Sequence, residues 1–124
     1  MDKLNCYQNI IKKILTEYAE IFSQVPDQDI EEILMFDDNR SQYLWFNIGW
    51  KNGKRIKAIS VYLRQKNDKI YMEEDWTEAV IATELMRLGI PSSEIVLAFQ
   101  PPEVRQFTKQ ICDRLKIILY FLVR

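Results

Sequence analysis

Residues 42–66 read QYLWFNIGWKNGKRIKAISVYLRQK and decide the fold. The stretch consists of two runs rich in β-branched and aromatic residues, with Asn52-Gly53 between them. Asn-Gly is the strongest short hairpin signal, because both central residues of a type I′ turn need a positive φ that these two residues tolerate. The stretch therefore predicts two antiparallel strands joined by a two-residue turn.

Similar runs flank this hairpin on both sides. Asp38-Asn39 and Asn67-Asp68, which are typical turn residues, separate the hairpin from its neighbours. The pattern predicts a four-stranded antiparallel meander with strands at residues 30–36, 42–50, 55–65 and 70–74.

The pairing register follows by counting outward from two-residue turns. Phe46 then faces Ile59, Leu44 faces Val61 and Tyr43 faces Tyr62. Alternation along each strand predicts a core face made of Leu44, Phe46, Ile48, Ile59, Val61, Leu63, Ile70 and Met72. The second face would carry an aromatic cluster of Tyr43, Trp45 and Tyr62, which suits a protein interface or stacking of single-stranded bases.

Two helices and one more strand complete the predicted fold. Apolar residues recur every three or four positions from Leu4 to Phe22, which indicates a long amphipathic first helix. Asp75 as N-cap, with Glu78 three residues later, predicts a second helix that runs to about Leu88.

A C-cap and a proline, Gly89 and Pro91, end this second helix, and the apolar run 94–99 then reads as a short fifth strand. Because the helices do not alternate with the strands of the meander, the fold class is α+β.

Composition excludes several function classes. The 124 residues make one domain, and 17 basic residues balance 18 acidic ones, unlike the basic excess of a free-standing nucleic-acid binder. The chain has no histidine, which excludes Ser-His and Cys-His catalysis and removes the commonest metal ligand. We therefore expect no catalytic site and no metal site.

The cysteines and the apolar runs of the sequence predict where in the cell the protein is located. Cys6 and Cys112 match neither a metal motif nor a disulfide framework, so we expect reduced thiols. The longest apolar run, residues 117–123, is far shorter than the roughly 20 residues that a membrane helix needs. These features predict a soluble, cytoplasmic protein that makes no membrane contact.

Charge is distributed unevenly along the predicted strands. Residues 51–66 contain six basic residues and no acid, among them Lys54, Arg55 and Lys57, whereas residues 27–38 contain six acids and no base. The basic hairpin could be a solvated surface, a protein interface or a DNA-binding site. Complementary charge on two strands of one chain also permits a homodimer.

Several segments together resemble one known family. They are the opening MDKLN with Tyr7, the strand end NIGW leading into GKR, the helix IATEL followed by GIP, and IVLAF running into PPEVRQFT. These segments are similar to the XisI family, the fdxN element excision controlling factors. The resemblance covers residues 1–108 as a single XisI-like domain, and residues 109–124 form an extension that does not match.

The resemblance implies a small, non-enzymatic accessory protein, associated with cyanobacteria, that is needed for the site-specific excision of a DNA element. It implies no catalytic residues and no cofactor. Its implied partners are an XisH-like protein and a site-specific recombinase. By position, the resemblance makes Pro101, Pro102, Glu103, Val104 and Arg105 candidates for partner binding, although two prolines can equally form a rigid exit from the last strand.

Two alternative functions stay open at this point. One is direct DNA binding as an architectural or directionality factor, and the other is antitoxin-like inhibition of a nuclease-like partner.

Overall fold

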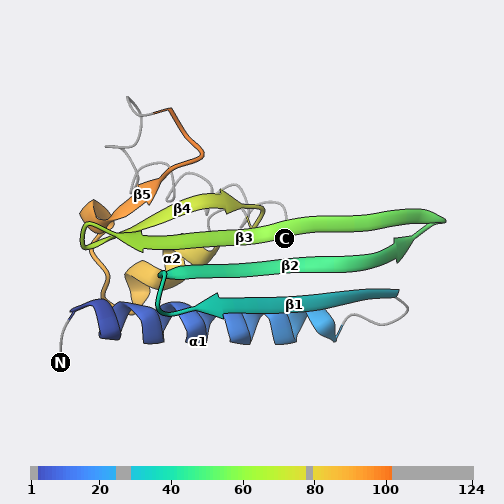
Figure 1. Ribbon diagram of the computed structural model, residues 1–124, viewed down its shortest axis with the longest axis horizontal. Helices are drawn as coiled ribbons and strands as arrows, with labels where there is room; N and C mark the ends of the chain where they lie inside the picture. The colour runs from blue at the N-terminus through green and yellow to red at the C-terminus, as the bar shows by residue number, and fades with distance from the viewer. Residues whose placement is uncertain (1–2, 25–28, 78–79, 102–124) are drawn as a thin grey trace, which may run out of the picture.

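One long helix and one short helix pack on a five-stranded sheet in the part of the chain that the structure describes, residues 3–24, 29–77 and 80–101 of a computed structural model (Figure 1). The sheet order is β1-β2-β3-β4-β5, with the first four strands antiparallel and β5 parallel to β4. The elements are α1 (Lys3–Ser23), β1 (Asp29–Asp37), β2 (Gln42–Lys51), β3 (Lys54–Lys66), β4 (Lys69–Asp75), α2 (Val80–Arg87), a 3₁₀ turn (Ser92–Glu94) and β5 (Ile95–Leu97). The predicted α+β class and the meander are confirmed.

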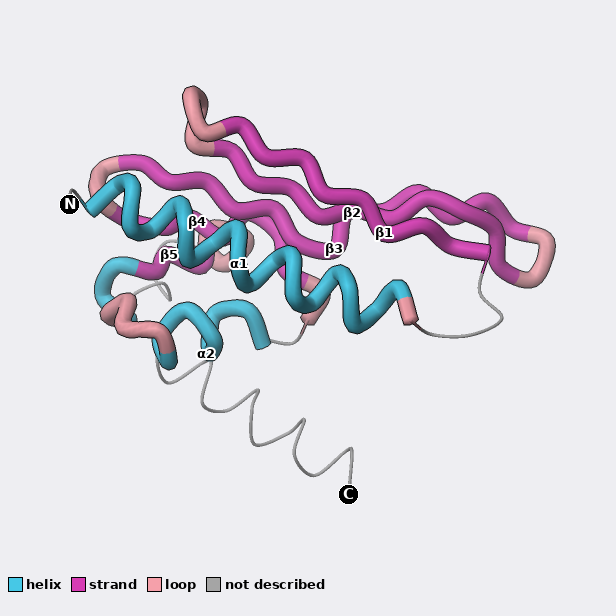
Figure 2. The backbone as a smooth tube through the Cα atoms, turned by 90° about the horizontal axis from the view of Figure 1, so that it is seen from below, coloured by secondary structure: helices cyan, strands magenta, loops and turns pink. Residues whose placement is uncertain are grey.

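α1 and α2 lie on the same side of the sheet (Figure 2). The apolar stripe of α1 is buried as its spacing predicts, and Ile11, Ile14 and Leu15 join Ile81 and Leu85 of α2 in a single core. Neither helix, over the residues described, is long and apolar enough to cross a membrane. Cys6 on α1 has a free thiol, whereas Cys112 lies outside the described residues.

Two of the three predicted two-residue turns are present, whereas the turn at Asp38-Asn39 spans four residues, 38–41. Asn52 and Gly53 have φ of 52° and 77°, and Asn67 and Asp68 have φ of 55° and 60°. Positive φ at both central positions is the type I′ conformation, whose twist matches that of the flanking strands. Lys51 therefore pairs with Lys54, as a two-residue turn at Asn52-Gly53 predicts.

A β-bulge changes the register in the middle of the β2–β3 hairpin. Phe46 pairs with Ile59 as predicted, but Trp45 pairs with Val61, so that Ser60 is an extra residue on β3. Beyond this point the predicted pairs are wrong, because Leu44 faces Tyr62 and Tyr43 faces Leu63.

The bulge also corrects the predicted faces of β2. Tyr43 and Trp45 are 0% and 2% exposed and lie in the core with Val61 and Leu63. Because β-strand side chains alternate, one extra residue on β3 is enough to bring these aromatic residues onto the face that carries Val61. The residues that move to the opposite face are Leu44, Phe46, Ile48 and Ile59.

The ends of α2 follow the sequence signals in part. Asp75 still belongs to β4, and its carboxylate accepts a hydrogen bond from the Thr77 backbone N–H at 2.7 Å. Glu78, the predicted partner in the helix cap, lies outside the described residues. At the other end Gly89 has a φ of 103°, and the Ile90 N–H donates to the Leu85 carbonyl at 3.1 Å, which confirms the predicted C-cap.

The predicted fifth strand is confirmed but shorter, since Ser92–Glu94 forms the 3₁₀ turn and β5 spans Ile95–Leu97. Glu94 in this turn accepts hydrogen bonds from the Lys3 ammonium and the Tyr7 hydroxyl. It thereby ties the start of α1 to the strand at the far edge of the sheet. The Lys3 and Tyr7 hydrogen bonds hold the pKa of Glu94 below its usual value, and burial together with Glu94 raises the pKa of Tyr7 to about 12.

The lowered pKa of Glu94 predicts part of the acid sensitivity of the fold. The unfolded chain binds a proton at this carboxylate more tightly than the folded chain. Its stabilising contribution is therefore present above the ordinary glutamate pKa of about 4.3 and is lost as the pH falls through the lower pKa of the folded chain. Replacing Glu94 by Gln (E94Q) should therefore reduce the difference in melting temperature between neutral and acidic pH. E20Q, at an exposed carboxylate of α1, is the control, and an equal effect of both substitutions would contradict the assignment.

Gly49 on β2 is required by close packing against β1. A Cβ atom at this position would lie 2.1 Å from the backbone oxygen of Asp29. We expect Gly49→Ala to lower the free energy of unfolding by about 2 kcal/mol, because the two strands must separate locally. Gly53→Asn, where a Cβ would meet nothing within 4 Å, should change it by about 0.5 kcal/mol or less in the same urea titration.

Candidate functional site

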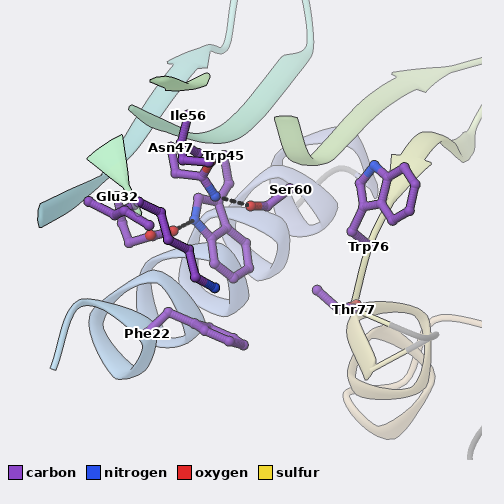
Figure 3. Close-up of a pocket in the computed structure, with 10 residues that line it drawn as sticks. Phe22, Glu32, Trp45, Asn47, Ile56, Ser60, Trp76 and Thr77 are labelled. Atoms are coloured by element: carbon purple, nitrogen blue, oxygen red, sulfur yellow. Dashed lines mark hydrogen bonds between the residues drawn. The ribbon is translucent and has the colours of Figure 1, made fainter. Parts of the chain in front are cut away.

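A pocket of about 300 Å³ opens on the helix side of the sheet, where α1 ends and β4 leads toward α2 (Figure 3). Its walls combine aromatic rings with a few polar groups, the usual composition of a binding site. The residues that line it are Phe22, Ile30, Glu32, Trp45, Asn47, Lys51, Ile56, Ser60, Trp76 and Thr77.

Trp45 forms the buried wall of this pocket. Its indole N–H donates to the Glu32 carboxylate at 2.8 Å, so the polar atom of a core tryptophan is satisfied. The Phe22 ring lies against it, with ring centroids 5.4 Å apart and planes tilted by 52°. These contacts fix both the indole and the Glu32 carboxylate at the edge of the pocket.

Asn47 and Ser60 supply the other polar groups. The Asn47 amide nitrogen donates to the Ser60 hydroxyl at 3.1 Å. The Asn47 amide oxygen is buried and accepts no hydrogen bond from any side chain or backbone group in the described ranges. Ser60 is the bulged residue of β3, so the irregularity that buries Trp45 also places a hydroxyl beside this amide.

The polar groups of the pocket are arranged for hydrogen bonding. The Ser60 hydroxyl is bonded to the Asn47 amide, which is not a general base. Within the described ranges, no three His, Cys, Asp or Glu side chains are grouped to hold a metal ion. The pocket instead offers the Glu32 carboxylate, the Asn47 amide oxygen, the Lys51 side chain and aromatic rings, which together match a neutral side chain that donates hydrogen bonds.

Trp76 stands at the mouth of the pocket, on the side away from Glu32 (Figure 3). It is 76% exposed, and its indole N–H donates to the Glu74 carboxylate at 2.7 Å. An exposed tryptophan beside a preformed pocket is typical of a protein contact site, because tryptophan is enriched among the residues that dominate binding energy.

The structure separates the three aromatic residues predicted to form one cluster. Tyr43 and Trp45 are core residues on the helix side, whereas Tyr62 is half-buried on the opposite face and donates a hydrogen bond to the Gln42 side chain. The prediction of an exposed cluster is wrong because it relied on a register without the bulge.

Only some of the other predicted site residues belong to the described part of the chain. Lys54 and Lys57 are exposed near the tip of the β2–β3 hairpin, and the Arg55 guanidinium lies 5.4 Å from the centre of the Trp50 ring. Pro101 is exposed. The remaining predicted residues, Pro102, Glu103, Val104 and Arg105, lie outside the described part of the chain, as does the extension 109–124.

Sequence reasoning missed the pocket itself. Asn47 and Ser60 are the signal that could have found it, because each is a polar residue in the middle of an otherwise apolar strand. Glu32 and Trp76 carry no such signal, since acidic residues are common in this segment and a tryptophan after a strand is as often buried as exposed.

The contrast between the two tryptophans gives a test of the geometry. We expect Trp45→Ala to lower the free energy of unfolding by about 3–5 kcal/mol, because it leaves a cavity in the core. Trp76→Ala should change it by about 0.5 kcal/mol or less, since this side chain is mostly in solvent. Urea unfolding followed by circular dichroism measures both, and similar costs for the two variants would contradict the structure.

Comparisons with known proteins agree on one family. The family model described as XisI protein matches residues 1–110. A crystal structure of a XisI-like protein from Anabaena variabilis ATCC 29413 is 38% identical, with a TM-score of 0.75 over 84% of this chain and 94% of that one. The crystal structure of the fdxN element excision controlling factor XisI from the same organism is also 38% identical, with a TM-score of 0.73 over 84% and 99%. No match was found among curated proteins. The chain belongs to the XisI family.

Proposed function

We propose that this protein is a non-enzymatic controlling factor for the site-specific excision of a DNA element, and that it acts by binding other proteins. One solved relative is the fdxN element excision controlling factor XisI from Anabaena variabilis, which supports the role in excision. The partners that we propose are an XisH-like protein and a site-specific recombinase. The pocket beside Trp76 is the observation that carries the proposed mechanism.

The chemistry of the pocket indicates what it binds. Glu32 supplies a carboxylate, and the buried Asn47 oxygen lacks a donor among the described residues. A neutral donor from a partner, such as an asparagine or glutamine amide, could donate to both groups while its alkyl part packs against Phe22 and Trp76. Lys51 lines the same pocket and disfavours a cationic side chain.

Direct DNA binding is the alternative function, with Lys54, Arg55 and Lys57 as contacts. These residues share their sheet with an acidic strand, because Asp29 and Arg55 both pair with Trp50 on either side of β2. Their separation is two strand spacings, roughly 10 Å, so the acids lower the positive potential that a phosphate backbone needs mainly at low salt, where the screening length is longer. The formal net charge of -1 also favours protein binding over DNA binding.

Co-purification tests the proposal. We expect the tagged full-length protein to retain the XisH-like protein or the recombinase of its own organism, and Trp76→Ala to reduce the retained amount by about tenfold. Phe99→Ala is the matched control, because it also removes an exposed aromatic ring but lies outside the pocket. Both variants should keep the wild-type circular dichroism spectrum.

Two results would overturn the proposal. One is equal retention by Trp76→Ala and the wild-type protein, which would leave the pocket without a role in partner binding. The other is salt-sensitive binding of a labelled DNA duplex by the protein alone that is lost in a Lys54, Arg55 and Lys57 triple alanine variant. That second result would make DNA contact the function.

A further inference from the structure

The face of the sheet turned away from α1, here called the outer face, is apolar at its centre. No helix of the described ranges packs on it, and both helices lie on the other side (Figure 2). Met35 and Trp50 are 59% and 51% exposed, and a shallow hollow of about 480 Å³ runs beside Met35, Leu44 and Tyr62. Apolar surface of this kind on a soluble domain usually marks a contact site.

The pairing of β1, β2 and β3 arranges the outer face in five rows. Each row runs across the three strands at one height, because the residues in it are paired partners. In order along the strands, the rows are Asp29–Trp50–Arg55, Glu31–Ile48–Lys57, Ile33–Phe46–Ile59, Met35–Leu44–Tyr62 and Asp37–Gln42–Arg64.

Charge is sorted by strand in these rows. In the first, second and fifth rows the β1 residue is an acid and the β3 residue is a base, as in Glu31 and Lys57. The two central rows are apolar, apart from the Tyr62 hydroxyl. The face therefore has a hydrophobic centre, an acidic border along β1 and a basic border along β3.

We propose that the outer face binds a second copy of this chain, with a two-fold axis that lies in the interface along β2. This rotation places β1 of one copy over β3 of the other. It does not shift the copies along the strands, so each row packs against the same row of the partner. Glu31 of each copy then faces the partner's Lys57, and the apolar rows pack on themselves. An isologous interface requires this kind of self-complementary surface.

The alternative face-to-face rotation is unfavourable. A two-fold axis perpendicular to the strands would place β1 over β1 and β3 over β3 in reversed row order. Asp29 would then face Asp37, Arg55 would face Arg64, and Glu31 and Lys57 would face the apolar row of Met35 and Tyr62. Glu31 and Lys57 are exposed, and neither forms an ion pair within the described ranges, so both are available to a partner. Packed sheets lie about 10 Å apart with strands crossing near −30°, which a small tilt of the axis provides.

Charge reversal tests this interface. We expect the full-length wild-type protein to sediment as a dimer at micromolar concentration. Lys57→Glu should weaken the dimer by about tenfold or more, because the symmetry places the new like-charge contact in the interface twice. The double variant Glu31→Lys with Lys57→Glu exchanges the two charges and should restore dimerisation. Lys13→Glu, on the exposed side of α1, is the matched control for a change of the same charge.

A mixing experiment separates the interface from any effect on folding. Glu31→Lys alone and Lys57→Glu alone should each be mainly monomeric, but an equimolar mixture should form heterodimers, because each acid then meets a base. A monomeric wild-type protein at low and at physiological salt would overturn the proposal. A dimer that Lys57→Glu does not weaken would overturn it as well.

Discussion

The β-bulge at Ser60 is the constraint on which the rest of this structure depends. With the bulge, Trp45 pairs with Val61 and its side chain joins the core. Without it, the two strands would place Leu44 and Phe46 against α1 and expose two large aromatic residues to water. Burying a tryptophan and a tyrosine removes more apolar surface from water than burying a leucine and a phenylalanine of the same strand, which favours the bulged register.

In the bulged register, hydrogen bonds offset the cost of burying the polar atoms of these aromatic residues. The Trp45 N–H donates to Glu32, and the Tyr43 hydroxyl donates to Asp38 at 2.9 Å. Burial and the Asp38 carboxylate raise the pKa of Tyr43, so the phenol stays protonated and keeps donating. The same register places Ser60 beside Asn47 in the pocket and turns Leu44, Phe46 and Ile59 outward. One local irregularity thus shapes both surfaces to which we assign binding.

The features that were predictable from sequence are those that short-range chemistry decides. Asn52-Gly53 specifies its own turn, and the Gly89 C-cap is fixed by a positive φ. The face of β2 was not predictable, because Tyr43, Leu44, Trp45 and Phe46 are all apolar or aromatic and alternation cannot choose between them. The pocket was missed for a related reason. Its residues come from α1, three strands and a loop, and only the three-dimensional register brings them together.

The burial of Trp45 is the most direct test of the central claim, that the bulge decides which residues of β2 lie in the core and which lie on the outer face. Replacing Trp50 and Trp76 by phenylalanine leaves Trp45 as the single tryptophan of the chain. The account predicts blue-shifted fluorescence that iodide and acrylamide quench weakly, as for an indole in a dry core. Red-shifted emission that both quenchers reach readily would place Trp45 in solvent. That result would contradict the bulged register and both binding surfaces that depend on it.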